Sequence, residues 1–236
     1  MENTLFEAPE YPILAKFKTC VILFVKQAII LLLMLLLIRI AEIGFYYFSK
    51  QVHGNSISLM ADGMLSSFIY FLKSLPILFI PYVVIFFSNM RGLALKIMNY
   101  ILFALYLLVE LLLAKYFFET KMLLGETLPL GQHIELTKWF SPNYYWFGGV
   151  ILVLVLLWFL LETARKLVFI ETISAFVIVT VGLLMLFFGV SSLPEEEKSV
   201  LFRVKVSKSA YLLEKTCAFY FEEEPEVDIY KENYID

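Results

Sequence analysis

IILLLMLLLI, residues 29–38, is an unbroken apolar run that decides the fold class of this chain. A strand of a transmembrane barrel alternates between apolar and polar residues, and this run does not. The apolar segment around it extends from Lys26 to Phe48. About 20 mostly apolar residues are enough for a helix to cross the hydrocarbon core of a bilayer. The run therefore predicts a transmembrane helix.

Four more apolar segments follow, which predicts an all-α integral membrane protein with a bundle of five transmembrane helices. The expected spans are residues 26–48, 66–87, 97–118, 145–161 and 167–190. The composition agrees, because 61% of the residues are hydrophobic and 17% are charged, against about 45–50% and about 25% in a soluble domain. The first span is too long for a cleavable signal peptide and has no cleavage site after it, so we expect an uncleaved anchor.

Basic residues near the ends of the expected spans predict the orientation. They concentrate in the N-terminal flank and after the second and fourth spans: Lys16, Lys18, Lys26, Arg91, Lys96, Arg165 and Lys166. Short loops that face the cytoplasm carry an excess of Lys and Arg. We therefore expect a cytoplasmic lead at residues 1–25, a transmembrane domain at 26–190, and an extracytoplasmic juxtamembrane helix and linker at 191–236.

The tail has a different composition from the rest of the chain. Residues 194–236 hold eleven acidic and six basic residues. Within the tail, Ala210, Leu213, Cys217 and Phe221 recur at helical spacing, and Ser207 is a possible N-cap. This pattern predicts a short amphipathic helix over residues 207–221.

Two prolines, Pro76 and Pro81, lie inside the expected second span. Each removes a backbone donor and leaves a carbonyl of the preceding turn without its helical partner. A membrane tolerates such a carbonyl only where neighbouring protein covers it. We therefore expect the second span to pack against protein rather than to face lipid on all sides.

Five charged residues within or beside the spans form the candidate site: Arg39, Glu42, Asp62, Lys73 and Glu110. Charges inside a membrane are costly, so each is a candidate for function or for pairing. Arg39 and Glu42 are three residues apart and can form an ion pair on one helical face. Asp62 binds a headgroup or a metal, or caps the second span. Lys73 can extend toward the interface, whereas Glu110 lies deepest; lipid-headgroup and structural roles both stay open for the set.

Catalytic, metal and nucleic-acid motifs do not occur in this sequence. His133 and Glu135 supply two possible metal ligands, fewer than a site requires, and His53 is isolated. Cys20 and Cys217 have no ligand spacing and lie on opposite sides of the expected membrane, so they cannot pair. We therefore assign no catalytic residue, no metal ligand and no cofactor, and we expect a lipid bilayer but no nucleic acid as a partner.

Three local stretches resemble a known family: ISLMADGMLS at 57–66, YFFETKMLLGE at 116–126 and KSAYLLEK at 208–215. With the layout of five spans and an external tail, they resemble the N-terminal membrane region of the lipoteichoic acid synthase family. Its members are bacterial phosphoglycerol transferases and related sulfatase-like enzymes of the alkaline-phosphatase superfamily. None of these stretches is catalytic.

The resemblance implies a membrane anchor in the cytoplasmic membrane of a bacterium, which presents a phospholipid substrate through the charged residues of the candidate site. The metal-bound nucleophile of the family, with its Mn or Mg ion, belongs to an external catalytic domain that is absent from this chain. That domain, or another external protein, is the expected partner of the tail.

Two alternatives remain. In the first, the chain is a non-enzymatic scaffold whose external helix docks a partner. In the second, it is a small transporter or channel subunit in which the kinked second span and Glu110 line a path.

Overall fold

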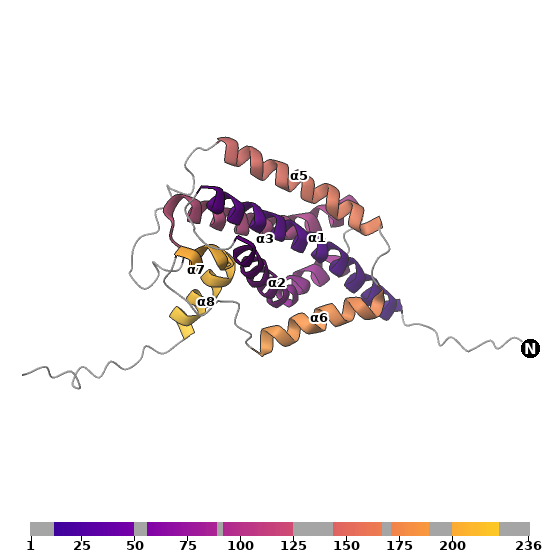
Figure 1. The fold of residues 1–236 in the computed structure, drawn as a ribbon. Coiled ribbons are helices and arrows are strands. Elements are labelled where there is room, and N and C mark those ends of the chain that lie inside the picture. The colour runs from indigo at the N-terminus through magenta and orange to yellow at the C-terminus, as the bar shows by residue number, and fades with distance from the viewer. Residues whose placement is uncertain are drawn as a thin grey trace, which may run out of the picture.

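The computed structural model describes residues 12–49, 56–88, 92–124, 144–166, 171–188 and 200–221. These ranges are helical and contain no strand, so the expected all-α class is confirmed for them. The helices are α1 (Pro12–Phe48), α2 (Ser56–Phe87), α3 (Leu93–Thr120), α5 (Tyr144–Lys166), α6 (Thr172–Phe187), α7 (Val200–Lys205) and α8 (Lys208–Phe221) (Figure 1).

Four of the described helices, α1, α2, α3 and α5, are long and apolar enough to cross a membrane. The fifth apolar helix, α6, has 16 residues, about 24 Å of helix, which is shorter than a hydrocarbon core of about 30 Å. The expected fifth span, 167–190, extends past both ends of α6 into residues outside the described ranges. The structure therefore supports a helical membrane protein with four candidate spans and one shorter apolar helix.

The first two helices begin earlier than the expected spans, at Pro12 instead of Lys26 and at Ser56 instead of Ser66. The first part of α1 is packed into the bundle, because Cys20 and Phe24 are fully buried. Aromatic contacts with α2 and α6 hold this part in the bundle. They join the following ring pairs: Phe24–Phe79, Phe17–Phe79 and Phe17–Phe176.

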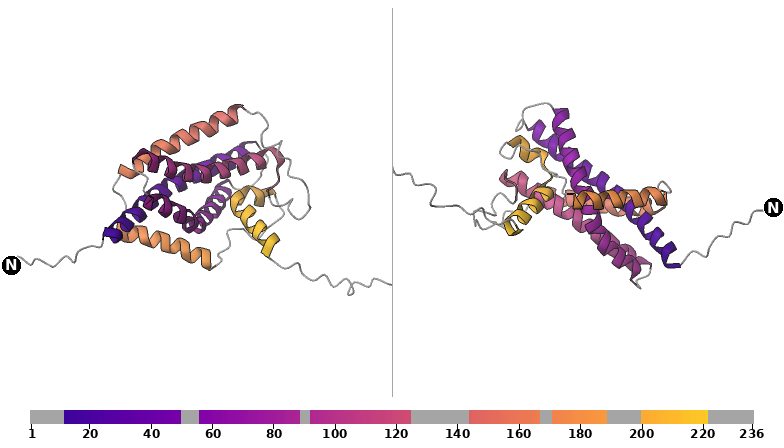
Figure 2. Two further views of the ribbon diagram at one scale, coloured as in Figure 1. Left: turned by 180° about the vertical axis from the view of Figure 1, so that it is seen from behind. Right: turned by 90° about the horizontal axis from the view of Figure 1, so that it is seen from below.

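The central helix of the bundle is α1, which packs against α2, α3, α5 and α6. Helix α5 covers α1 and α3, whereas α6 covers α1 and α2, so these two helices lie on opposite sides of the bundle (Figure 1). Helix α7 contacts α1 and α2, and α8 contacts α3. Both lie at one end of the bundle, opposite the start of α1 (Figures 1 and 2). The tail therefore packs onto the end where α1 finishes.

The packing of α2 against α6 depends on a glycine opposite Pro76. Proline cannot donate to the carbonyl of Leu72 four residues earlier. Gly182 lies over that carbonyl, since a Cβ at Gly182 would be 2.7 Å from the Leu72 oxygen and 3.4 Å from Pro76 Cδ. The expectation that protein covers the second span is thus confirmed at Pro76. At Pro81 the neighbouring Ile77 and Ile80 are exposed.

Within the described ranges, buried apolar side chains form two clusters. The larger cluster joins α1, α2, α3, α5 and α6 over most of the bundle. The smaller one, at the α7 end, combines Ile43, Tyr46 and Leu59 of the long helices with Phe202 and Val204 of the tail. The tail is therefore part of the folded core.

Candidate functional site

The tail enters the end of the bundle as a turn between α7 and α8. Val204 and Val206 are completely buried there, and the three residues that follow are almost as buried. Gly63 of α2 lies between Ile43 and the turn, because a Cβ at this position would lie 2.4 Å from Ile43 Cδ1 and 3.5 Å, an ordinary contact distance, from the Lys205 carbonyl oxygen. A larger residue at position 63 would therefore displace the side chain of Ile43 next to the tail.

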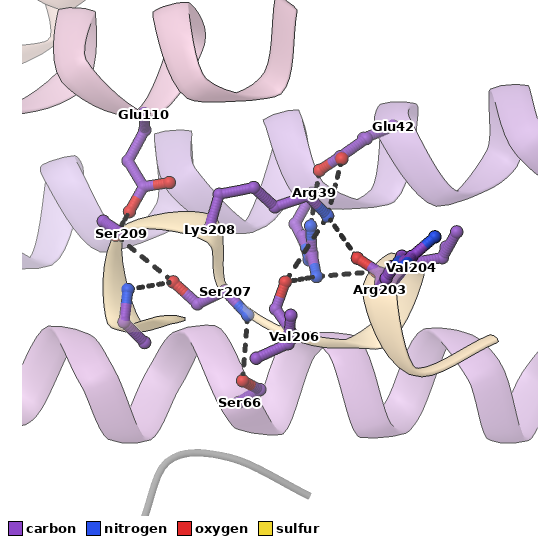
Figure 3. Close-up of polar contacts among 11 residues, drawn as sticks. Arg39, Glu42, Ser66, Glu110, Arg203, Val204, Val206, Ser207, Lys208 and Ser209 are labelled. Carbon is purple, nitrogen blue, oxygen red and sulfur yellow. Dashed lines mark hydrogen bonds and ion pairs between the residues drawn. The ribbon is translucent and has the colours of Figure 1, made fainter. Parts of the chain in front are cut away.

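Arg39 is the central donor of the site (Figure 3). Its side chain is only 5% exposed. One terminal nitrogen pairs with Glu42, so the ion pair expected from their spacing is confirmed. The other donates to the carbonyl of Val204 at 2.7 Å and to that of Val206. The guanidinium therefore joins α1 to the tail through backbone carbonyls, which carry no signal in a sequence.

Lys208 is the cation opposite Glu42. Its ammonium lies 2.8 Å from Glu42 Oε1, 4.4 Å from the ring centre of Phe117, and donates to the carbonyl of Arg203 at 3.1 Å. Burial, with the nearby charge of Arg39, lowers the pKa of Lys208 to about 7, although Glu42 opposes the shift. Desolvation of the ammonium therefore outweighs its pairing.

The start of α8 is held by hydroxyl groups. Ser209 donates to Glu110 of α3, and the Ser207 amide donates to Ser66 of α2 at 3.1 Å. The Ser207 hydroxyl accepts the amide of Ala210 at 3.5 Å. This contact places Ser207 at the expected N-cap position, and the predicted amphipathic helix is confirmed as Lys208–Phe221. Glu110 therefore meets the tail at Ser209, 99 residues away in the chain.

Asp62 and Lys73 also contact the tail. Asp62 pairs with Lys205 at 2.8 Å. The interpretation of Asp62 as a helix cap is wrong, because α2 begins at Ser56 and Asp62 lies within it; the apolar residues before Asp62 extend the helix. Lys73 lies 3.8 Å from Glu214 of α8, an ion pair that the sequence did not indicate.

All five candidate residues thus contact the same short segment, 204–214. They leave a cavity of about 20 Å³, lined by residues that include Arg39, Tyr70, Glu110 and Lys208. This volume holds about one water molecule. Arg39 Nε finds no acceptor in the described part of the chain. Sequence reasoning found the bundle side of the site but missed its partners Lys205, Lys208 and Glu214.

The opposite end of the bundle has its own polar contacts. Glu162 of α5 pairs with Lys96 of α3 and with Arg165. With its amide oriented to match its neighbours, Gln27 donates to the Tyr82 hydroxyl at 3.1 Å and accepts from Arg165 Nε at 2.7 Å. These contacts join α1, α2, α3 and α5 and do not involve the tail.

Metal ligands do not gather in the described ranges, where no three His, Cys, Asp or Glu side chains are close enough to hold an ion. His53, His133 and Glu135 lie outside those ranges. The two cysteines are free; Cys20 is buried and Cys217 is exposed.

Comparison of the chain with protein-family models, with curated proteins and with solved structures finds no match.

Proposed function

We propose that this chain is a membrane anchor whose intramembrane charges hold residues 200–221 in one orientation at the membrane. One observation carries the proposal: each of the five charged candidates contacts the tail. A buried charge that loses its partner costs about 3–5 kcal/mol. The tail therefore supplies the partners that make these charges tolerable in the bundle, and the charges in turn select one docked geometry.

The proposal includes five spans, with α6 and its apolar flanks as the fifth, in the cytoplasmic membrane of a bacterium. The start of α1 is cytoplasmic and the α7–α8 end is outside, which agrees with the lysines near the start of α1 and in α3 and α5. A reporter that is active only outside the cytoplasm, fused after Asp236, tests this orientation. Activity is expected, and an inactive but expressed fusion would reverse the assignment.

The proposal extends to the family that the sequence resembles. A docked helix directly after the last span suits a module that orients an external phosphoglycerol transferase or sulfatase-like domain. The nucleophile and its Mn or Mg ion then belong to that domain. Reading the gene beyond the codon for Asp236 tests this part, and the lack of such a domain would remove it without affecting the anchor.

Lipid presentation by the five charged residues needs a change of conformation. Their cavity, about 20 Å³, is far smaller than a phosphoglycerol headgroup, and their polar atoms already bind the tail. A headgroup can therefore reach them only when α7 and the start of α8 move away. This makes docking of the tail the primary role, with presentation of a phospholipid as a second state.

Hydrogen exchange of the reconstituted full chain tests the anchor. Arg39→Met removes the donor to both tail carbonyls, so amide protection over residues 200–221 should fall while that of α5 and α6 is kept. The matched control is Lys96→Met, which breaks an ion pair at the opposite end and should leave tail protection unchanged. Equal tail protection in the wild type and Arg39→Met would refute the docking role.

A further inference from the structure

Helix α8 has an unusual distribution of side chains. Beyond its buried first turn, its most exposed residues are apolar, with Leu213 at 50%, Phe219 at 52% and Tyr220 at 69% exposure, and Cys217 is also exposed. Its charged residues are less exposed. A helix that faces water shows the opposite arrangement, with its charged face outward.

The polar contacts of α8 determine which way these apolar residues point. Lys208 contacts Glu42 of α1, Ser209 contacts Glu110 of α3, and Glu214 contacts Lys73 of α2. Three contacts to three helices fix the rotation of α8 about its own axis. The outward position of Leu213, Cys217 and Tyr220, which recur at helical spacing, is therefore built into the docked structure.

The location of α8 identifies what covers this face. It lies at the end of the bundle where α6 finishes and α5 begins (Figures 1 and 2). Aromatic residues are exposed there on both helices, at Tyr144, Tyr145, Phe187 and Phe188. Belts of exposed aromatic side chains are typical of the boundary between lipid and water.

The helix on which α8 packs also has an exposed apolar surface. Helix α8 packs on α3, which exposes an apolar stripe at four-residue spacing: Ile97, Ile101, Leu105 and Val109. A stable protein interface buries roughly 800 Å² on each partner, whereas an aromatic side chain contributes about 150–250 Å² when fully buried. The few half-exposed side chains of α8 provide too little area for a protein partner but suit insertion between lipids.

We propose that α8 lies in the membrane–water interface, with Leu213, Cys217 and Tyr220 inserted at the boundary of lipid headgroups and acyl chains. Helices that lie in this plane insert one apolar face by about 5–10 Å. The polar contacts to the bundle then hold the helix from one side while lipid holds it from the other. This inference rests on the membrane placement of the bundle.

Cys217 is a native probe on the inserted face, since Cys20 is fully buried and should not react in the folded chain. A nitroxide label on Cys217 of the full chain in phosphatidylglycerol–phosphatidylethanolamine vesicles should collide with oxygen, which concentrates in lipid, more than with a water-soluble nickel chelate. Cys217→Ser is the blank and should take up no label. Leu105→Cys in that background is the matched reference on the lipid-facing stripe of α3.

The outcomes separate the possible coverings of α8. A lipid-type collision ratio at both sites supports the proposal. A water-type ratio at Cys217 with a lipid-type ratio at Leu105→Cys overturns the interfacial position of α8 and leaves the membrane anchor intact. Water-type ratios at both sites overturn the interfacial position of α8 and the membrane placement of the bundle as well. Low collision with both reagents at Cys217 indicates that protein covers this face, which also overturns its insertion into lipid. Dipolar broadening of the spectrum would then identify the covering protein as a second copy of the chain.

Discussion

The ammonium of Lys208 lies 2.8 Å from a carboxylate oxygen of Glu42, so the first residue of α8 pairs with a residue near the end of α1. The Lys208 side chain is 4% exposed and that of Glu42 is 10% exposed, and Arg39 contacts the same carboxylate from α1. The pair therefore joins α1 to α8, the first and the last of the described helices.

Substitution of Lys208 by methionine should destabilise the chain by about 1–3 kcal/mol, because Glu42 loses one charged hydrogen-bond partner and keeps Arg39. Unfolding in detergent micelles measures the loss. The control is Lys215→Met on the same helix, where a cation–π contact to Tyr211 predicts about 1 kcal/mol or less. Equal losses for the two lysines would contradict a special role for Lys208.

Stability should rise with pH above neutrality. The pKa of Lys208 is about 7 in the folded chain and about 10.4 in an unfolded one. Between these values the unfolded chain binds more protons, so the free energy of unfolding increases by up to about 1.4 kcal/mol per pH unit. Unfolding measured at pH 7 and pH 9 should show this slope in the wild type and not in Lys208→Met. A flat wild-type profile between pH 7 and pH 9 would mean that Lys208 stays charged because pairing outweighs burial.

Gly182 should not tolerate alanine. The added Cβ would lie 2.7 Å from the backbone oxygen of Leu72, so α6 must move away from α2 at a cost of about 1–3 kcal/mol. Gly148 of α5 is the matched control, because a Cβ there has no atom within 4 Å and alanine favours a helix by up to about 1 kcal/mol. Thermal unfolding should therefore shift down for Gly182→Ala and remain level or rise for Gly148→Ala.

The reactivity of the two thiols should differ. Cys20 is fully buried between helices and Cys217 is exposed on α8. A membrane-impermeant maleimide added to intact cells should modify Cys217 slowly, because the thiol is partly covered by lipid, and should not modify Cys20. Denaturation in SDS should make both reactive, and mass spectrometry of the peptides counts the modified sites. Modification of Cys20 in folded protein would place the first half of α1 outside the core.

Much of the fold follows from local properties of the chain. The apolar run at residues 29–38 is enough for a helix in lipid, because only a helix satisfies all its backbone groups within one segment. The spacing of Arg39 and Glu42 is likewise enough for their ion pair, and the spacing of apolar residues after Ser207 is enough for α8. The exact helix ends were less predictable. Pro12 and Ser56 start their helices early because packing against α2, α6 and the tail adds stability that no local pattern records.

The sequence by itself determined that this protein is helical and suited to a membrane, and that its spans carry charges which need partners. Only the tertiary structure decided who those partners are. Lys205, Lys208, Ser209 and Glu214 come from a tail that is distant in the chain, and two of the acceptors of Arg39 are backbone carbonyls, which every residue possesses. Hydrogen bonds and ion pairs act over a few ångströms of space, so their partners are defined only when the chain has folded.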